Sequence, residues 1–126
     1  MSDRTQSFSQ ILLECIDEGL SVLGNEPREA AYQFLRTICS LPREEIPERV
    51  PEFAGGLKKA LGGASKVIER VTLRKLFERI GSNFREVPDA DFNDYVIDAK
   101  RRFEIVSHRR DDSVDSPRLK KGQVSS

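Results

Sequence analysis

The sequence has few of the residues on which most metal and nucleophile chemistry depends. Its 126 residues include one histidine, His108, and two cysteines, Cys15 and Cys39. A zinc site needs several His or Cys ligands, and a histidine base needs a fixed position beside its nucleophile. We therefore expect no metal site and no cofactor, and we predict that the protein is not an enzyme.

A long apolar run and an export signal are also missing. No stretch reaches the roughly 18 apolar residues of a membrane span. The opening MSDRTQSFSQ lacks a basic segment followed by an apolar one. We expect a cytoplasmic protein with free thiols and no membrane partner. Cys15 and Cys39 fall on neighbouring predicted helices with an axial mismatch of roughly 6 Å, which favours buried thiols over a disulfide.

An excess of one charge is absent from the chain as a whole. The 21 Lys and Arg residues balance 21 Asp and Glu residues, so there is no global electrostatic argument for a nucleic-acid partner. The charge is nevertheless divided: residues 1–57 hold 5 basic and 10 acidic side chains (net −5), and residues 58–126 hold 16 and 11 (net +5). Either folding interleaves the two halves, or the surface is dipolar and recognises a charged partner.

Helical periodicity runs through most of the chain, and strand-like alternation is nowhere sustained. Apolar residues recur at helical spacing over about Ser9–Leu23, Glu26–Cys39, Pro51–Leu61, Ala64–Ile80 and, starting at Asp89 or Asp91, through Val106. We predict an all-α fold, a compact bundle of about four or five helices around a central helix. The helical domain covers residues 1–106, and the charged segment 107–126 is expected to be a disordered tail.

Several local signals refine this prediction. Ser7 and Gln10 fit a capping box for the first helix, and Asn25 is a candidate cap for the second. The connection between these helices is short, which predicts an antiparallel hairpin. The residues expected on the inner face of the second helix are Ala31, Phe34, Leu35 and Ile38. The proline-rich segment that follows should be an ordered loop held by Leu41, Ile46 and Val50.

The predicted helix over residues 64–80 has an unusual pattern. Its apolar residues fall on one face before Thr72 and on roughly the opposite face after it. The first group is Ala64, Val67, Ile68 and Val71, and the second is Leu73, Leu76, Phe77 and Ile80. We favour a central helix with different neighbours at its two ends; a homodimer contact through the Leu73–Ile80 face is the alternative.

Half of the eight glycines stand in two pairs, at positions 55–56 and 62–63. A phosphate-binding loop would place a Ser or Thr directly after its lysine, whereas Ser65 here precedes Lys66. The second pair is better explained as the end of one helix and the start of the next. The first pair indicates close helix packing or a kink, since each helical glycine costs about 1 kcal/mol relative to alanine.

A basic row is the main candidate for a partner-binding surface. Lys66, Arg70 and Arg74 follow one another at a spacing of one helical turn. The residues that we predict to bind a partner are Lys58, Lys66, Arg70, Arg74, Lys100 and Arg101. The simpler interpretation is an ordinary solvated helix face.

The stretch EEIPERVPEFAGGLKKALGGASKVIERVTLRKLFERIG, from Glu45 to Gly81, carries a family resemblance together with the later FNDYVIDAKRRFE. They resemble a small archaeal all-helical family that includes the Nitrososphaera-type output domains of signal-transduction proteins and stand-alone proteins of unknown function. The resemblance covers about Ser9–Val106 and brings no catalytic or ligand residues with it. It implies a role as a signalling output or regulatory domain.

The function that we predict is therefore a non-enzymatic protein-interaction module that binds a protein partner through the basic helix face. The alternative is a nucleic-acid-binding regulator that uses the basic row and the basic C-terminal segment.

Overall fold

The computed structural model describes residues 7–115, with side chains described as far as residue 105, and every regular element in this range is helical. The elements are α1 (Phe8–Ser21), α2 (Asn25–Ile38), the 3₁₀ helix η2 (Arg43–Glu48), α3 (Val50–Leu61), α4 (Ala64–Arg79) and α5 (Phe92–Asp115). The all-α prediction is confirmed, and the predicted bounds of the first four α-helices are close to those observed. No described helix is both long and apolar enough to cross a membrane.

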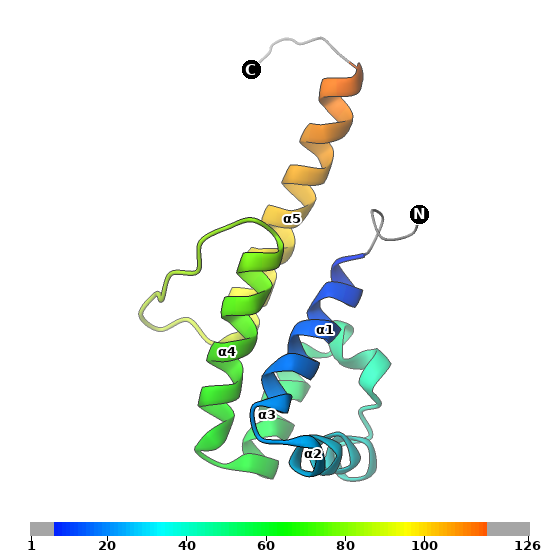
Figure 1. The fold of residues 1–126 in the computed structure, drawn as a ribbon, viewed down its shortest axis with the longest axis vertical. Helices are drawn as coiled ribbons and strands as arrows, with labels where there is room; N and C mark the ends of the chain where they lie inside the picture. The colour runs from blue at the N-terminus through cyan, green and yellow to red at the C-terminus, as the bar shows by residue number, and fades with distance from the viewer. Residues whose placement is uncertain (1–6, 116–126) are drawn as a thin grey trace.

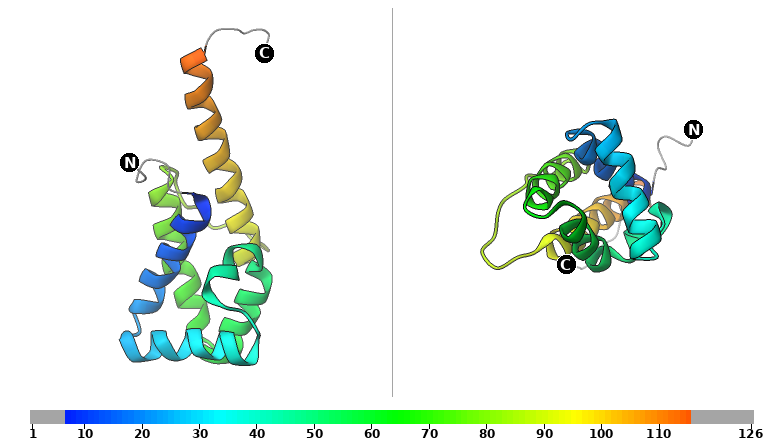
Figure 2. Two further views of the ribbon diagram at one scale, coloured as in Figure 1. Left: turned by 90° about the vertical axis from the view of Figure 1, so that its right-hand side faces the viewer. Right: turned by 90° about the horizontal axis from the view of Figure 1, so that it is seen from below.

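The predicted hairpin of the first two helices is wrong. In Figures 1 and 2, α1 runs along the long axis of the molecule, while α2 lies across one end of the bundle. The turn is set by Gly24, which is the N-cap of α2. Its φ of 107° is a backbone conformation that glycine adopts readily and other residues rarely do. Asn25 is the first residue of the helix and not its cap. The predicted hairpin assumed that α1 packs mainly on α2, whereas its most extensive neighbour is α4.

The crosswise position of α2 also changes which of its residues are buried. Ala31 and Leu35 are buried as predicted, but Phe34 is only half-buried and Ile38 is 65% exposed. A helix that caps the end of a bundle contacts it through a narrow stripe, so the outer part of a wide apolar face stays in water.

The first helix, α1, and the last helix, α5, begin at capping residues that the sequence indicated. The Ser7 hydroxyl accepts a hydrogen bond from the Gln10 N–H at 3.2 Å, and the Gln10 side chain accepts one from the Ser7 N–H at 3.1 Å. Asp91 and Asp94 repeat this exchange at the start of α5, with distances of 2.9 and 3.0 Å. Both pairs satisfy N–H groups that the helix itself leaves unbonded.

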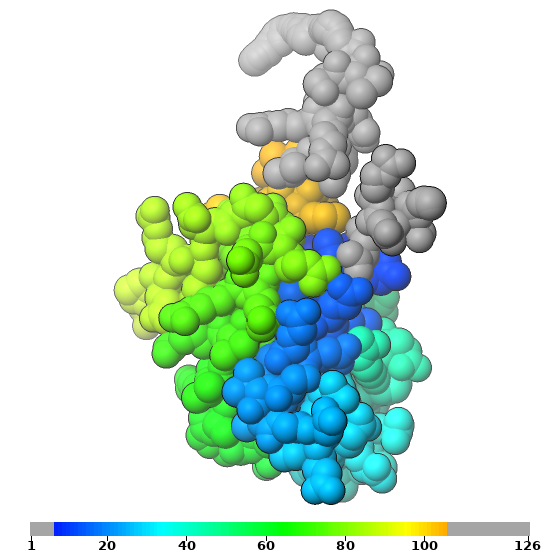
Figure 3. Space-filling model, viewed as in Figure 1, coloured from blue at the N-terminus to red at the C-terminus, as the bar shows by residue number. Residues whose placement is uncertain are grey.

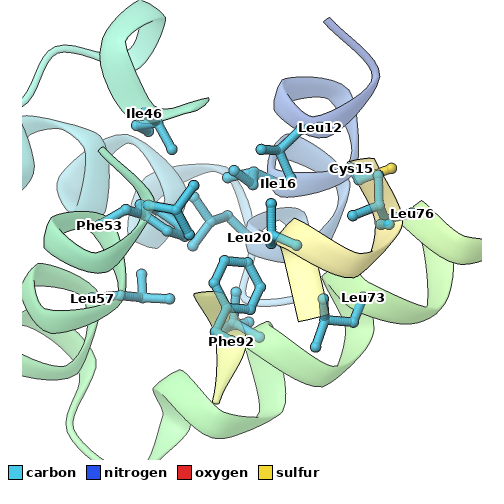
Figure 4. Close-up of a cluster of buried hydrophobic side chains, with 14 of the residues drawn as sticks. Leu12, Cys15, Ile16, Leu20, Ile46, Phe53, Leu57, Leu73, Leu76 and Phe92 are labelled. Atoms are coloured by element: carbon cyan, nitrogen blue, oxygen red, sulfur yellow. The ribbon is translucent and has the colours of Figure 1, made fainter. Parts of the chain in front are cut away.

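The core is formed by α1, α3, α4 and α5, whose apolar side chains point toward one another in Figure 4. Phe53 of α3 and Phe92 of α5 contact each other with ring centroids 5.8 Å apart. The proline-rich segment is held as expected, since Leu41, Ile46 and Val50 are all buried. Because that segment forms η2 and packs on α1, it closes the core on the side away from α4.

Helix α4 is the central helix, in contact with α1, α3 and α5. Its apolar face does not change sides, however, because two small polar residues, Ser65 and Thr72, are buried at 3% and 1% exposure. They continue a single buried stripe with Ile68 and Leu76. Val67, which the sequence assigned to the inner face, is 55% exposed.

The face that was considered for a homodimer contact lies inside the protein. Leu73, Leu76 and Phe77 are each 3% exposed or less. They pack in the core, so these three residues are not available to a second subunit, while Ile80 is partly exposed.

The two oppositely charged halves of the sequence meet along α1 and α4. Arg79 Nη2 lies 2.6 Å from a carboxylate oxygen of Glu14, and Lys75 Nζ lies 3.6 Å from one of Glu18. The acidic and basic halves are therefore interleaved along this contact.

The last helix is longer than the sequence indicated. It was expected to end near Val106, but α5 continues to Asp115 and extends past the other helices in Figure 2. The rest of the predicted tail, residues 116–126, lies outside the described residues, as does the side chain of His108.

Candidate functional site

A groove of about 730 Å³ opens between α3, α4 and the segment that leads from α4 into α5. We call it the α3–α4 groove. The connecting segment, coloured yellow-green, stands out beside α4 in Figure 3. Its residues Phe84, Glu86, Val87, Pro88, Ala90 and Asp91 form one wall of the groove. The other residues that line the groove come from α3, α4 and the start of α5: Pro51, Ala54, Gly55, Lys58, Ser65, Lys66, Glu69, Arg70, Leu73, Phe92, Asn93 and Tyr95.

The floor of the groove is open because α3 carries small residues there. A Cβ atom placed on Gly55 would meet no other atom within 4 Å, and its neighbour Ala54 is also small. The next residue, Gly56, is closely packed instead: a Cβ there would lie 2.6 Å from Leu35 Cδ2 and 2.9 Å from Cys39 Sγ. The first glycine pair therefore serves close packing at Gly56 and leaves space at Gly55.

The wall between α4 and α5 is held in place by aromatic side chains. The Tyr95 hydroxyl accepts a hydrogen bond from the Val87 N–H at 2.8 Å and donates one to the Val87 carbonyl at 3.2 Å. Phe84 packs between Phe77 and Tyr95, with ring centroids 5.5 and 5.3 Å away. These contacts fix a segment that has no regular secondary structure, so the groove has a defined second side.

One acidic side chain lies within the groove without a hydrogen bond to its carboxylate from the described part of the chain. Glu69 is partly buried, and burial raises the pKa of its carboxyl group. Lys66 and Lys58 oppose this increase, while Asp91 adds to it. Both lysines are exposed, and within residues 7–105 neither forms an ion pair. The site thus has two available cations and one partly desolvated anion.

Arg70 has a partner of its own across the groove. Its Nε lies 2.9 Å from a carboxylate oxygen of Glu86, and both side chains are more than half exposed. An exposed pair of this kind contributes about 0–1 kcal/mol. The pair connects α4 to the aromatic wall, but it is weak enough for Arg70 to bind another carboxylate instead.

The structure brings together three of the six residues predicted to bind a partner. Lys58, Lys66 and Arg70 line the groove. Arg74 is exposed on α4 outside it. Lys100 and Arg101 are exposed on α5 and do not line it either.

The sequence prediction missed Glu69 and the aromatic wall. Glu69 stands inside a polar stretch of α4, and nothing in its spacing distinguishes it from a solvated residue. Phe84 lies in a linker with no periodicity. The small residue at position 55 was the one available signal, because it leaves a gap on a helix face.

Within residues 7–105, no group of three or more His, Cys, Asp or Glu side chains is arranged so that it could hold a metal ion. No family model matches the chain, and no curated protein or solved structure is significantly similar to it.

Proposed function

We propose that the protein is a non-enzymatic protein-interaction module and that the α3–α4 groove binds a short peptide segment of its partner. The observation on which this rests is the position of Glu69, a partly buried carboxylate without a hydrogen bond to it from the described residues, between Lys58 and Lys66. A carboxylate withdrawn from water normally accepts hydrogen bonds, so a groove in which Glu69 accepts none from the described residues is suited to a ligand that donates one.

The chemistry of the lining indicates what the segment carries. A backbone N–H or a side-chain amide would donate to Glu69. A carboxylate would pair with Lys58 and Lys66, which are exposed and not neutralised by an ion pair. An apolar side chain would cover Phe84 and the open floor at Gly55. The partner segment is therefore acidic with at least one apolar residue, and the resemblance to signalling output domains supports a regulatory setting.

Selection from a displayed library of random peptides tests this proposal. Enriched peptides should combine an acidic and an apolar residue, and they should bind the full chain in fluorescence anisotropy. Gly55→Trp fills the open floor without meeting another atom at Cβ, and Lys66→Glu reverses one charge. We expect each to weaken binding at least about tenfold, because the tryptophan takes the space of the apolar side chain and the glutamate removes a charge-assisted contact.

Lys100→Glu combined with Arg101→Glu is the matched control, since these exposed residues lie outside the groove. It should leave peptide affinity unchanged, and circular dichroism should show that all variants remain folded. Failure to enrich any peptide, or an equal loss in the control, would exclude the groove as the binding site. Displacement of the peptide by duplex DNA would instead favour the nucleic-acid alternative.

A further inference from the structure

A second polar cluster lies where α1, α2 and η2 meet, and none of its residues lines the α3–α4 groove. Asp17 of α1 is its centre. Its carboxylate accepts hydrogen bonds from Arg43 Nε at 3.1 Å and Arg43 Nη2 at 2.5 Å, and a further one from the Tyr32 hydroxyl. A bidentate arginine pair of this kind fixes the orientation of both groups.

The negative charge of Asp17 is therefore balanced by an arginine of the protein itself. Burial and the hydrogen bond to Asp17 raise the pKa of Tyr32, so its hydroxyl remains a donor. Arg43 neutralises the carboxylate through Nε and Nη2. Its remaining N–H groups are therefore positioned but not occupied by Asp17.

Two more arginines stand one helical turn on either side of Tyr32 along α2. Arg28 donates to the Ser21 hydroxyl at 3.1 Å and lies 3.5 Å from the carboxylate of Glu29. Arg36 is exposed, and within residues 7–105 it forms no hydrogen bond through its side chain and no ion pair. Together with Arg43 they surround a hollow of about 340 Å³, which we call the arginine hollow.

The charges around the arginine hollow do not balance. Three arginines face two carboxylates, of which Asp17 is committed to Arg43. The other, Glu29, is 71% exposed and only 3.5 Å from Arg28, so it is a weak and displaceable partner. Three guanidinium groups and two carboxylates leave an excess of one positive charge around the hollow, which favours a bound anion.

We propose that the arginine hollow binds a phosphate monoester. Such a group carries about −1.5 to −2 charges at pH 7 and three acceptor oxygens. Arg28 and Arg36 of α2, together with the N–H groups of Arg43 that Asp17 does not occupy, can therefore bond different oxygens of one tetrahedral group. A hollow of about 340 Å³ also has room for part of the molecule that carries the phosphate. The same chemistry is offered by a phosphorylated side chain and by a small phosphorylated metabolite.

NMR titration of the arginine Nε–Hε signals tests this inference. The probes are inorganic phosphate, a phosphoserine peptide and a sugar phosphate, with chloride at matched ionic strength as the reference. We expect saturable shifts at Arg28 and Arg36 with each phosphate probe. The tightest of the three probes identifies the source of the phosphate.

Two substitutions give opposite expected effects. Arg36→Ala removes a side chain without a protein partner, so the fold should be intact, and it should weaken binding about tenfold, as for one charge-assisted hydrogen bond. Glu29→Gln removes the competing carboxylate and should tighten binding about twofold to threefold. Arg85→Ala, at an exposed position outside the arginine hollow, is the control and should change nothing. Shifts that do not saturate, shifts that chloride reproduces, or an unchanged phosphate affinity in Arg36→Ala would overturn the proposal.

Discussion

Gly19 in α1 lies directly against the hydroxyl of Thr72 in α4. A Cβ atom on Gly19 would overlap Thr72 Oγ1 and would lie 3.4 Å from the backbone carbonyl of Ile68. Both residues are buried. The two helices can therefore approach each other only because α1 presents no side chain at this point.

This relationship predicts that Gly19→Ala destabilises the protein by about 1–3 kcal/mol, the cost of overpacking a core. The loss should outweigh the gain of roughly 1 kcal/mol in helix propensity that alanine brings. Chemical denaturation followed by circular dichroism measures the change in the free energy of unfolding.

Thr72→Ala provides the test of the cause. Removing Oγ1 removes the overlap, so Gly19→Ala should cost little or even stabilise in the Thr72→Ala background. The double-mutant cycle should give a coupling energy of about 1–3 kcal/mol. Additive effects would show that Gly19 matters for another reason.

The two adjacent glycines of α3 form a natural matched pair. Gly55 faces open space, whereas a Cβ on Gly56 would lie 2.6 Å from Leu35 Cδ2. We expect Gly55→Ala to stabilise by about 0.5–1 kcal/mol, because a helical alanine loses less entropy than glycine. Gly56→Ala should instead destabilise by about 1–3 kcal/mol, as overpacking does. Melting curves of the two variants are sufficient, and changes of the same sign would contradict the assigned packing.

The sequence predicted helices better than it predicted their neighbours. Five helical segments and two caps could be located because apolar spacing and capping side chains are local properties. The crosswise position of α2 and the exposure of Ile38 depend on tertiary packing. An apolar helix face does not specify which element packs against it. Thr72 shows the same limit, since a residue that seemed to interrupt an apolar face is buried within it.

The candidate groove was only partly visible in the sequence for a related reason. Lys58, Lys66 and Arg70 could be chosen from charge and spacing alone. Glu69 could not, because its partial burial depends on a linker that returns over α4. The spacing along α4 also grouped Arg74 with the others, although that residue lies outside the groove.

The raised pKa of Glu69 predicts that this residue lowers the stability of the fold while it contributes to peptide binding. Because its pKa is raised in the folded state, the charged carboxylate destabilises the fold at every pH above that folded pKa. As pH falls through the folded pKa toward the ordinary value, the penalty disappears. Glu69→Gln should therefore raise the free energy of unfolding at pH 7 by about 0.5 kcal/mol, the scale of a change at a partly exposed position.

The same substitution should lose its advantage in acid. Denaturation curves at pH 7 and at pH 4 should show the difference between Glu69→Gln and the unmodified protein at the first value only. The variant should also bind the selected peptides less tightly, since glutamine is a weaker acceptor than a carboxylate. A variant that is less stable at pH 7 would mean that the carboxylate is satisfied in the folded protein.

The two thiols should differ sharply in reactivity. Cys15 is fully buried, and burial raises its pKa to about 11, whereas Cys39 is partly exposed. At pH 8 a thiol with that pKa holds roughly a hundredfold less thiolate than an ordinary one. Ellman's reagent should therefore modify one cysteine of the native protein quickly and the other only as the protein unfolds. Cys39→Ser should remove the fast phase alone, while two equal phases, or no free thiol, would contradict the burial of Cys15 in the contact between α1 and α4.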